Sequence, residues 1–178
     1  MSNRFSLKCL TREEGNSTIE FVIIFPLLMA LFLSVIEMGI MMTRYMMFER
    51  ALDVSMRTVR LDAESNYTRD SIRDTICEET LIARHCQSTL VLEMVRLDAD
   101  DQSWSFPTNS AVCANRADED AVPATNFVPG QSNDTMYVRA CISVTPMFPW
   151  AGLGASIVKD SSGDYSMVAL SAFAVEPI

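Results

Sequence analysis

The sequence predicts an α+β protein with a long N-terminal helix, a second helix and a small antiparallel sheet. Residues 21–42 form an apolar run, and apolar side chains keep a helical spacing beyond it, with no proline or glycine up to residue 63. After residue 87 the pattern changes to short segments rich in Thr, Val, Leu and Met, which are typical of strands. The 178 residues, 49% of them hydrophobic, have room for one membrane segment and one modest domain.

The apolar run 21–42 has the length of one membrane span. Its 22 residues would form a helix of about 33 Å, close to the hydrocarbon thickness of a bilayer. Pro26 removes one helical hydrogen bond and is expected to kink the helix. Glu37 lies two turns before Arg44, and we expect it to reach outward to water or to pair with Arg44. Contact between Glu37 and a partner helix is the alternative.

The same helix is expected to continue past the membrane, as far as residue 63. Apolar residues recur there at spacings of three and four, which gives the helix one apolar face. These residues are Tyr45, Phe48, Leu52, Met56 and Val59. Tyr45 also suits an anchor at the membrane surface.

The rest of the chain is expected to form a small head of residues 64–178. A helix is predicted from Arg69 to about Ala83, with Thr68 as its N-cap. Strands are predicted at 88–97, 136–145 and 165–175. Residues 156–159 are expected to pair with the last strand across a turn at 160–164, and the polar region 98–134 is expected to be a long functional or mobile loop.

Five cysteines bear on the compartment and on the stability of the head. Cys9 lies in the N-terminal segment 1–15, and the other four, Cys77, Cys86, Cys113 and Cys141, lie in the head. Four cysteines allow three pairings, of which we favour Cys77 with Cys86 and Cys113 with Cys141. A zinc site that uses these cysteines and His85 is the alternative, although neither a Cys-x-x-Cys spacing nor a second histidine is present.

The chain is acidic, with a net charge of −9 that becomes −10 without residues 1–15. This balance argues against nucleic-acid binding, which depends on clustered Lys and Arg. The acidic residues 118–120, with Asp100 and Asp101, could bind calcium, but EF-hand spacing is absent and a solvated loop is the favoured interpretation. No Walker loop, nucleophile elbow or zincin motif occurs, so we expect no enzymatic role, no metal and no cofactor.

The residues that precede the apolar run form a motif, Glu13-Glu14-Gly15-Asn16-Ser17-Thr18-Ile19-Glu20-Phe21. A carboxylate at the edge of a membrane is costly unless a positive charge pairs with it. Cleavage after Gly15 would create an amino group at Asn16, four residues and one helical turn before Glu20. Glycine at the cleaved position allows close approach of a protease.

This pattern resembles a class III prepilin signal, in which a short charged leader ends in Gly and Glu-Phe occupies the fifth and sixth mature positions. The run EEGNSTIEFVIIFPLLMALFLSVIEMG is most similar to the TadE/TadF-like pseudopilins of tight-adherence (Flp) pilus systems, which are type IVc pili. The likeness covers roughly residues 12–62. It implies a leader at 1–15, cleavage between Gly15 and Asn16, an assembly motif at Glu20 and Phe21, and a pilin-like long helix at 16–63. It also implies that the helix partly melts at Pro26 when the subunit leaves the membrane.

The resemblance implies a minor pseudopilin that assembles or initiates an adhesive pilus through helix packing. Its expected partners are a prepilin peptidase, other pseudopilins, the Flp pilin, the inner-membrane assembly platform and membrane lipid. Arg4, Lys8 and Arg12 favour a cytoplasmic N-terminus and a periplasmic head, although Arg44 and Arg50 weaken this signal. The alternative is an uncleaved single-pass protein whose periplasmic domain binds a ligand or a partner.

Overall fold

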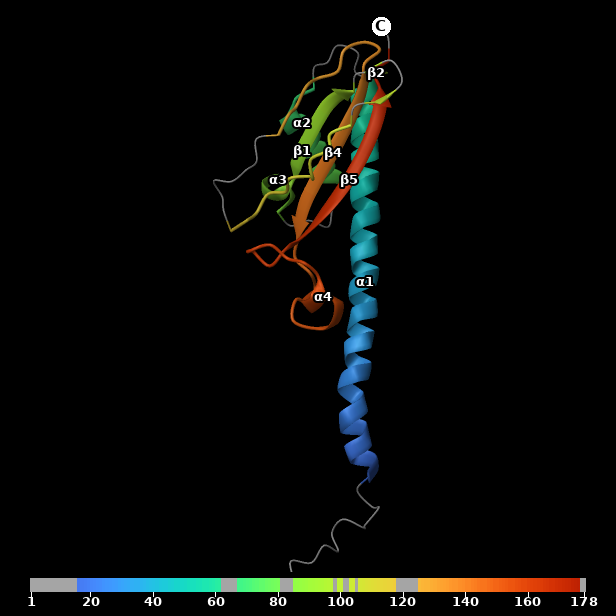
Figure 1. Ribbon diagram of the computed structural model, residues 1–178, viewed down its shortest axis with the longest axis vertical. Helices are drawn as coiled ribbons and strands as arrows, with labels where there is room; N and C mark the ends of the chain where they lie inside the picture. The colour runs from blue at the N-terminus through green and yellow to red at the C-terminus, as the bar shows by residue number, and fades with distance from the viewer. Residues whose placement is uncertain are drawn as a thin grey trace, which may run out of the picture.

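The computed structural model describes residues 16–61, 67–80, 85–97, 99–100, 103–104, 106–117 and 125–176. The predicted leader 1–15 and the acidic residues 118–120 lie outside these ranges. A single long helix, α1 (Asn16–Leu61), runs the length of the described molecule, and a small α+β head packs against its C-terminal half (Figure 1). The predicted fold class is confirmed.

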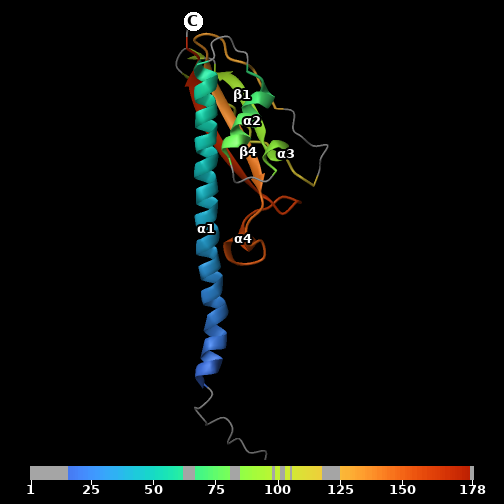
Figure 2. The same cartoon turned by 180° about the vertical axis from the view of Figure 1, so that it is seen from behind.

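Helix α1 has 46 residues and continues without interruption through Pro26. Its two halves differ in their surroundings, as seen from both sides of the molecule (Figures 1 and 2). The C-terminal half carries the predicted apolar face into the core, where Phe48, Leu52, Met56 and Val59 are at most 3% exposed. The helix up to Phe32 is exposed and lies outside the head. This division follows from sequence, because charged residues alternate with apolar ones only in the C-terminal half.

The head is built on a three-stranded antiparallel sheet in the order β1-β4-β5. The strands are β1 (Val91–Leu97), β4 (Thr135–Val144) and β5 (Tyr165–Ala174), and β4 lies in the centre. All three predicted strands are present, but residues 88–90 were wrongly included in the first. Cys86–Thr89 instead form the short helix α3, and the strand begins at Val91. A second, two-stranded sheet pairs β2 (Ala99–Asp100) with β3 (Ser103–Trp104).

Both faces of the central strand β4 are covered. On one face, Met136, Val138, Ala140 and Ile142 are fully buried in the core that includes α1 and α2. On the other face, the loop 106–117 is held to the sheet, because the Ser143 hydroxyl donates to the Ala114 carbonyl at 2.7 Å. The predicted long loop is therefore packed on the sheet over this stretch.

Helix α2 (Arg69–Glu79) has the predicted N-cap. The Thr68 hydroxyl accepts a hydrogen bond from the Ser71 N–H, and the Ser71 hydroxyl in turn accepts from the Thr68 N–H, which completes a capping box. The helix ends four residues before the predicted end at Ala83, a residue outside the described ranges. Thr80 leaves the helical conformation there, because the chain must reverse for Cys77 to reach Cys86.

The connection between β4 and β5 differs from the prediction. Residues 156–159 do not pair with β5, whose partner is β4 from Thr135 to Val144. Instead, residues 145–159, here called the 145–159 loop, contain the short helix α4 (Gly152–Ser156) and lie against α1 (Figure 1). The predicted turn at 160–164 is present, since the Gly163 N–H donates to the Asp160 carbonyl at 3.0 Å.

Candidate functional site

The N-terminal half of α1 presents an apolar surface to solvent. Large hydrophobic side chains from Ile19 to Val35 are mostly exposed, several by more than 60%. Within the described residues, α1 is long and apolar enough to cross a membrane, with a mean hydropathy of 2.7 over its most apolar 18-residue window. A soluble protein rarely leaves so many contiguous apolar side chains in water. One N-terminal helix could therefore anchor this protein in a membrane.

The predicted assembly motif lies at the start of this surface. Asn16 is the first residue of α1, and both Glu20 and Phe21 are exposed. The Phe21 ring packs against the Phe25 ring, one turn later, with 5.1 Å between ring centroids. Gly15 lies outside the described residues, so cleavage after it stays a prediction.

Glu37 is a second carboxylate on α1, and its environment differs from the prediction. It neither reaches water nor pairs with Arg44, since its side chain is fully buried. The two carboxylate oxygens accept hydrogen bonds from the backbone N–H groups of Met147 (2.9 Å) and Phe148 (2.8 Å). Arg44 instead donates to the Thr145 carbonyl at 2.9 Å. A buried carboxylate is tolerated when donors satisfy its oxygens, and the 145–159 loop supplies them.

A second polar contact fastens the same loop one turn earlier on α1. The Ser34 hydroxyl accepts from the Leu153 N–H at 3.1 Å and donates to the Ala30 carbonyl at 2.7 Å. Glycines allow this close approach. A Cβ on Gly152, whose φ is +55°, would lie 2.3 Å from the Ser34 hydroxyl oxygen. A Cβ on Gly154 would lie 2.4 Å from the Phe148 carbonyl oxygen.

Sequence reasoning missed this attachment, although two signals in the chain point to it. The stretch from Pro146 to Val158 carries no charged residue and includes the close pair Gly152 and Gly154, which is a mark of close backbone approach. Glu37, in turn, is a carboxylate within an apolar run and needs a partner. Their pairing could not be deduced, because 110 residues separate Glu37 from Met147.

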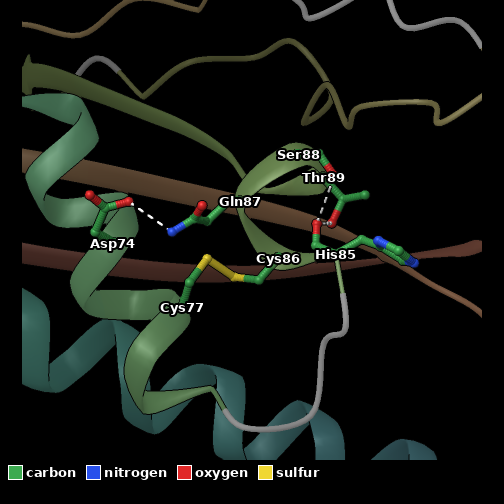
Figure 3. The surroundings of a disulfide bond; sticks show 7 residues. All are labelled: Asp74, Cys77, His85, Cys86, Gln87, Ser88 and Thr89. Carbon is green, nitrogen blue, oxygen red and sulfur yellow. Dashed lines mark hydrogen bonds between the residues drawn. A yellow bond between two sulfur atoms is a disulfide. The ribbon is translucent and has the colours of Figure 1, made fainter.

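Both predicted disulfides are present. Cys77 bonds Cys86, which ties α2 to α3 (Figure 3), and Cys113 bonds Cys141, which ties the loop 106–117 to β4. The His85 ring is exposed and points away from the first disulfide (Figure 3). The zinc alternative is therefore wrong for these cysteines, because their sulfurs are bonded to one another. Among the residues that the structure describes, no group of three or more His, Cys, Asp or Glu could hold a metal ion.

A buried ion pair between two strands also stabilises the head. Glu93 on β1 lies opposite Arg139 on β4, and the Arg139 Nε donates to the Glu93 carboxylate at 2.8 Å. Arg139 also donates to the Asn109 carbonyl at 2.6 Å, so it joins the sheet to the covering loop. The arrangement positions a loop and contains no nucleophile aligned with a base.

The N-terminal part of the chain is similar to a known protein family. Residues 15–57 match the model of the family described as TadE-like protein. The N-terminal helix is therefore similar to this family over most of its length. The match begins at Gly15 and ends within α1, so it includes the exposed apolar half with Glu20, Phe21 and Glu37. The head lies outside the matched residues. No curated protein and no solved structure matches the chain. The matched residues include the part of α1 that is long and apolar enough to cross a membrane.

Proposed function

We propose that this TadE-like chain is a minor pseudopilin, which a prepilin peptidase trims after Gly15 and which then assembles or initiates a Tad/Flp adhesive pilus. The observation that carries the proposal is the coincidence of the family match with α1. The matched residues 15–57 contain the motif at Glu20 and Phe21 and the whole exposed apolar half of the helix. One face of the C-terminal half of α1 is buried under the head. This division suits a subunit that associates through its helix and displays its head outside the membrane.

The mechanism is helix packing guided by one charge. Trimming creates an ammonium group at Asn16, one helical turn before Glu20 or beside the Glu20 of a neighbouring subunit. In lipid, a carboxylate that must meet an amine selects one register among helices that are otherwise uniformly apolar. Glu20 suits this task and Glu37 does not. Glu20 is exposed near the start of α1, whereas Glu37 is fully buried against the 145–159 loop.

The proposed location is the inner membrane, with the N-terminus in the cytoplasm and the head in the periplasm. Two disulfides in the head support an oxidising compartment for that part of the chain. The proposed partners are a prepilin peptidase, other pseudopilins, the Flp pilin and the inner-membrane assembly platform. The size of the head favours a minor subunit over the major pilin, and the role requires no enzymatic activity.

Co-expression with and without a prepilin peptidase tests the proposal. We expect the peptidase to remove fifteen residues, so that the purified protein begins at Asn16, and a Gly15→Ala variant to stay uncut. A Glu20→Ala variant should be trimmed but fail to support surface pili, with Asp53→Ala, which removes an exposed carboxylate from the same helix, as the matched variant that keeps Glu20. A protein from its native membrane that still begins at Met1 would support the uncleaved single-pass alternative and refute trimming.

A further inference from the structure

The 145–159 loop exposes apolar side chains beside the membrane helix. Trp150 is 77% exposed and Val158 is 89% exposed, the two highest values among the large hydrophobic residues that the structure describes. Met147 is 57% exposed on the same loop. Such exposure on a loop of a folded head marks a surface that something else covers.

The position of the loop along α1 indicates that this surface lies at the level of the membrane. A hydrocarbon layer of about 30 Å takes about 20 helical residues, so a span that begins at Phe21, the first residue of the apolar run, ends near Ile40. The loop is bonded to α1 at Ser34 and Glu37, just before that point. Ser34 lies about 9 Å deeper than Ile40, at a rise of 1.5 Å per residue. The loop backbone at Leu153 is thus level with the outer part of the hydrocarbon.

Several polar groups of the loop are also satisfied within the protein. Irregular backbone enters lipid only if its polar groups are satisfied within the protein. Two N–H groups donate to Glu37 and that of Leu153 donates to Ser34. The Lys159 ammonium donates to the carbonyls of Pro149 (3.0 Å) and Gly154 (2.7 Å).

Composition and shape agree with this placement. Residues 146–158 carry no charged side chain, in a chain whose net charge is −9. A mostly apolar open groove of about 580 Å³ joins the loop to α1 and is lined by Ile36, Gly39, Ile40, Thr43, Arg44 and Met147. Trp suits the boundary between hydrocarbon and headgroups, where its ring is in apolar surroundings and its N–H stays near water.

We propose that the 145–159 loop is a second membrane anchor, which inserts Trp150 and its apolar neighbours into the outer surface of the bilayer beside α1. The loop then fixes the head against the membrane and sets how far α1 emerges from it. The inference rests on the membrane anchoring of α1 but is independent of trimming after Gly15.

Tryptophan quenching by brominated lipid tests the proposal, because bromine quenches only at short range. The full chain is reconstituted into phosphatidylcholine vesicles whose acyl chains carry bromine near the headgroup end or near the methyl end. The chain has two tryptophans, so Trp104→Phe reports on Trp150 and Trp150→Phe reports on Trp104. Trp104 is the matched control, because β3 pairs with β2, which lies at the end of the head remote from α4 (Figure 1).

We expect bromine near the headgroup end to reduce Trp150 fluorescence by about twofold and to leave Trp104 nearly unchanged. The difference between the unmodified protein and Trp150→Phe gives the same answer if Trp104→Phe does not fold. Equal quenching of both tryptophans, or none, in protein that floats with the vesicles would overturn the loop anchor and leave α1 as the membrane anchor. Protein that does not float with the vesicles would overturn both the loop anchor and the anchoring of α1. Blue-shifted Trp150 emission without quenching would assign the loop to a contact with a second copy of the chain and also overturn the proposal.

Discussion

Glu37 accepts a hydrogen bond at 2.8 Å from the backbone N–H of Phe148, a residue 111 positions later in the chain. Together with the bond from Met147, this contact joins α1 to the connection between β4 and β5. The contact holds that connection against the helix. A carboxylate that sequence reasoning assigned to the membrane surface is therefore a structural attachment point within the subunit.

Replacement of Glu37 by alanine should weaken this attachment. Two buried N–H groups would lose a charged acceptor, and we expect a loss of about 2–4 kcal/mol in the free energy of unfolding. Glu37→Gln should lose about half as much, since one carbonyl oxygen still accepts. Denaturant unfolding in detergent measures the loss, and chymotrypsin cleavage within the loop should become faster.

Asp53→Ala is the matched control for this change, because Asp53 is an exposed carboxylate on the same helix. It should change the free energy of unfolding by less than about 0.5 kcal/mol. If Glu37→Ala and Asp53→Ala changed the free energy of unfolding equally, the bonds from Glu37 to the loop would contribute nothing to stability.

Gly154→Ala should also release the loop. Its new methyl group would lie 2.4 Å from the Phe148 carbonyl oxygen, which is backbone and cannot turn away, so the loop must shift. We expect Gly154→Ala to lower the free energy of unfolding by about 1–3 kcal/mol. Gly39→Ala is the matched change on α1, where a Cβ meets nothing within 4 Å, and should be neutral or gain up to about 1 kcal/mol through helix propensity. Thermal unfolding of the two variants would decide, and a stable Gly154→Ala protein would contradict the packing argument.

The sequence predicted those parts of the fold that depend on local patterns. Helix α1 follows from a continuous helical spacing, and the N-cap at Thr68 follows from residues within one turn. The 145–159 loop has no such pattern. Ile157 and Val158 are β-branched and favour a strand by themselves, but β4 and β5 pair with each other along their whole length. The partner of Glu37 likewise depends on tertiary packing, which no spacing in the chain encodes.

Tyr45 should show an alkaline titration that depends on Glu49. The Glu49 carboxylate raises the pKa of Tyr45 above 10.0, first through a hydrogen bond, and burial and the negative charge add to the effect. Because the folded-state pKa is the higher one, the stabilisation is complete below pH 10 and is lost as pH rises through that pKa. Glu49→Ala should lower the Tyr45 pKa, as followed by ultraviolet absorbance against a Tyr45→Phe reference. An unchanged Tyr45 pKa would rule out the contact with Glu49, and Asp53→Ala is the control.

The two disulfides should contribute unequally to the stability of the head. They close loops of different length, with sequence separations of 28 for Cys113–Cys141 and 9 for Cys77–Cys86. Because the longer loop removes more entropy from the unfolded chain, the contributions should be about 3.6 and 2.6 kcal/mol at 25 °C.

Denaturant unfolding of the two paired Cys→Ala variants measures this difference, in a Cys9→Ser background that prevents mispairing. We expect the variant without Cys113 and Cys141 to be less stable by about 1 kcal/mol, and the loop 106–117 to become the first site of proteolysis. That disulfide also holds the strand from which Arg139 and Ser143 bond the loop, so its loss acts on the whole covered face of β4. Equal stability of the two variants would mean that native packing, and not loop entropy, determines what each disulfide contributes.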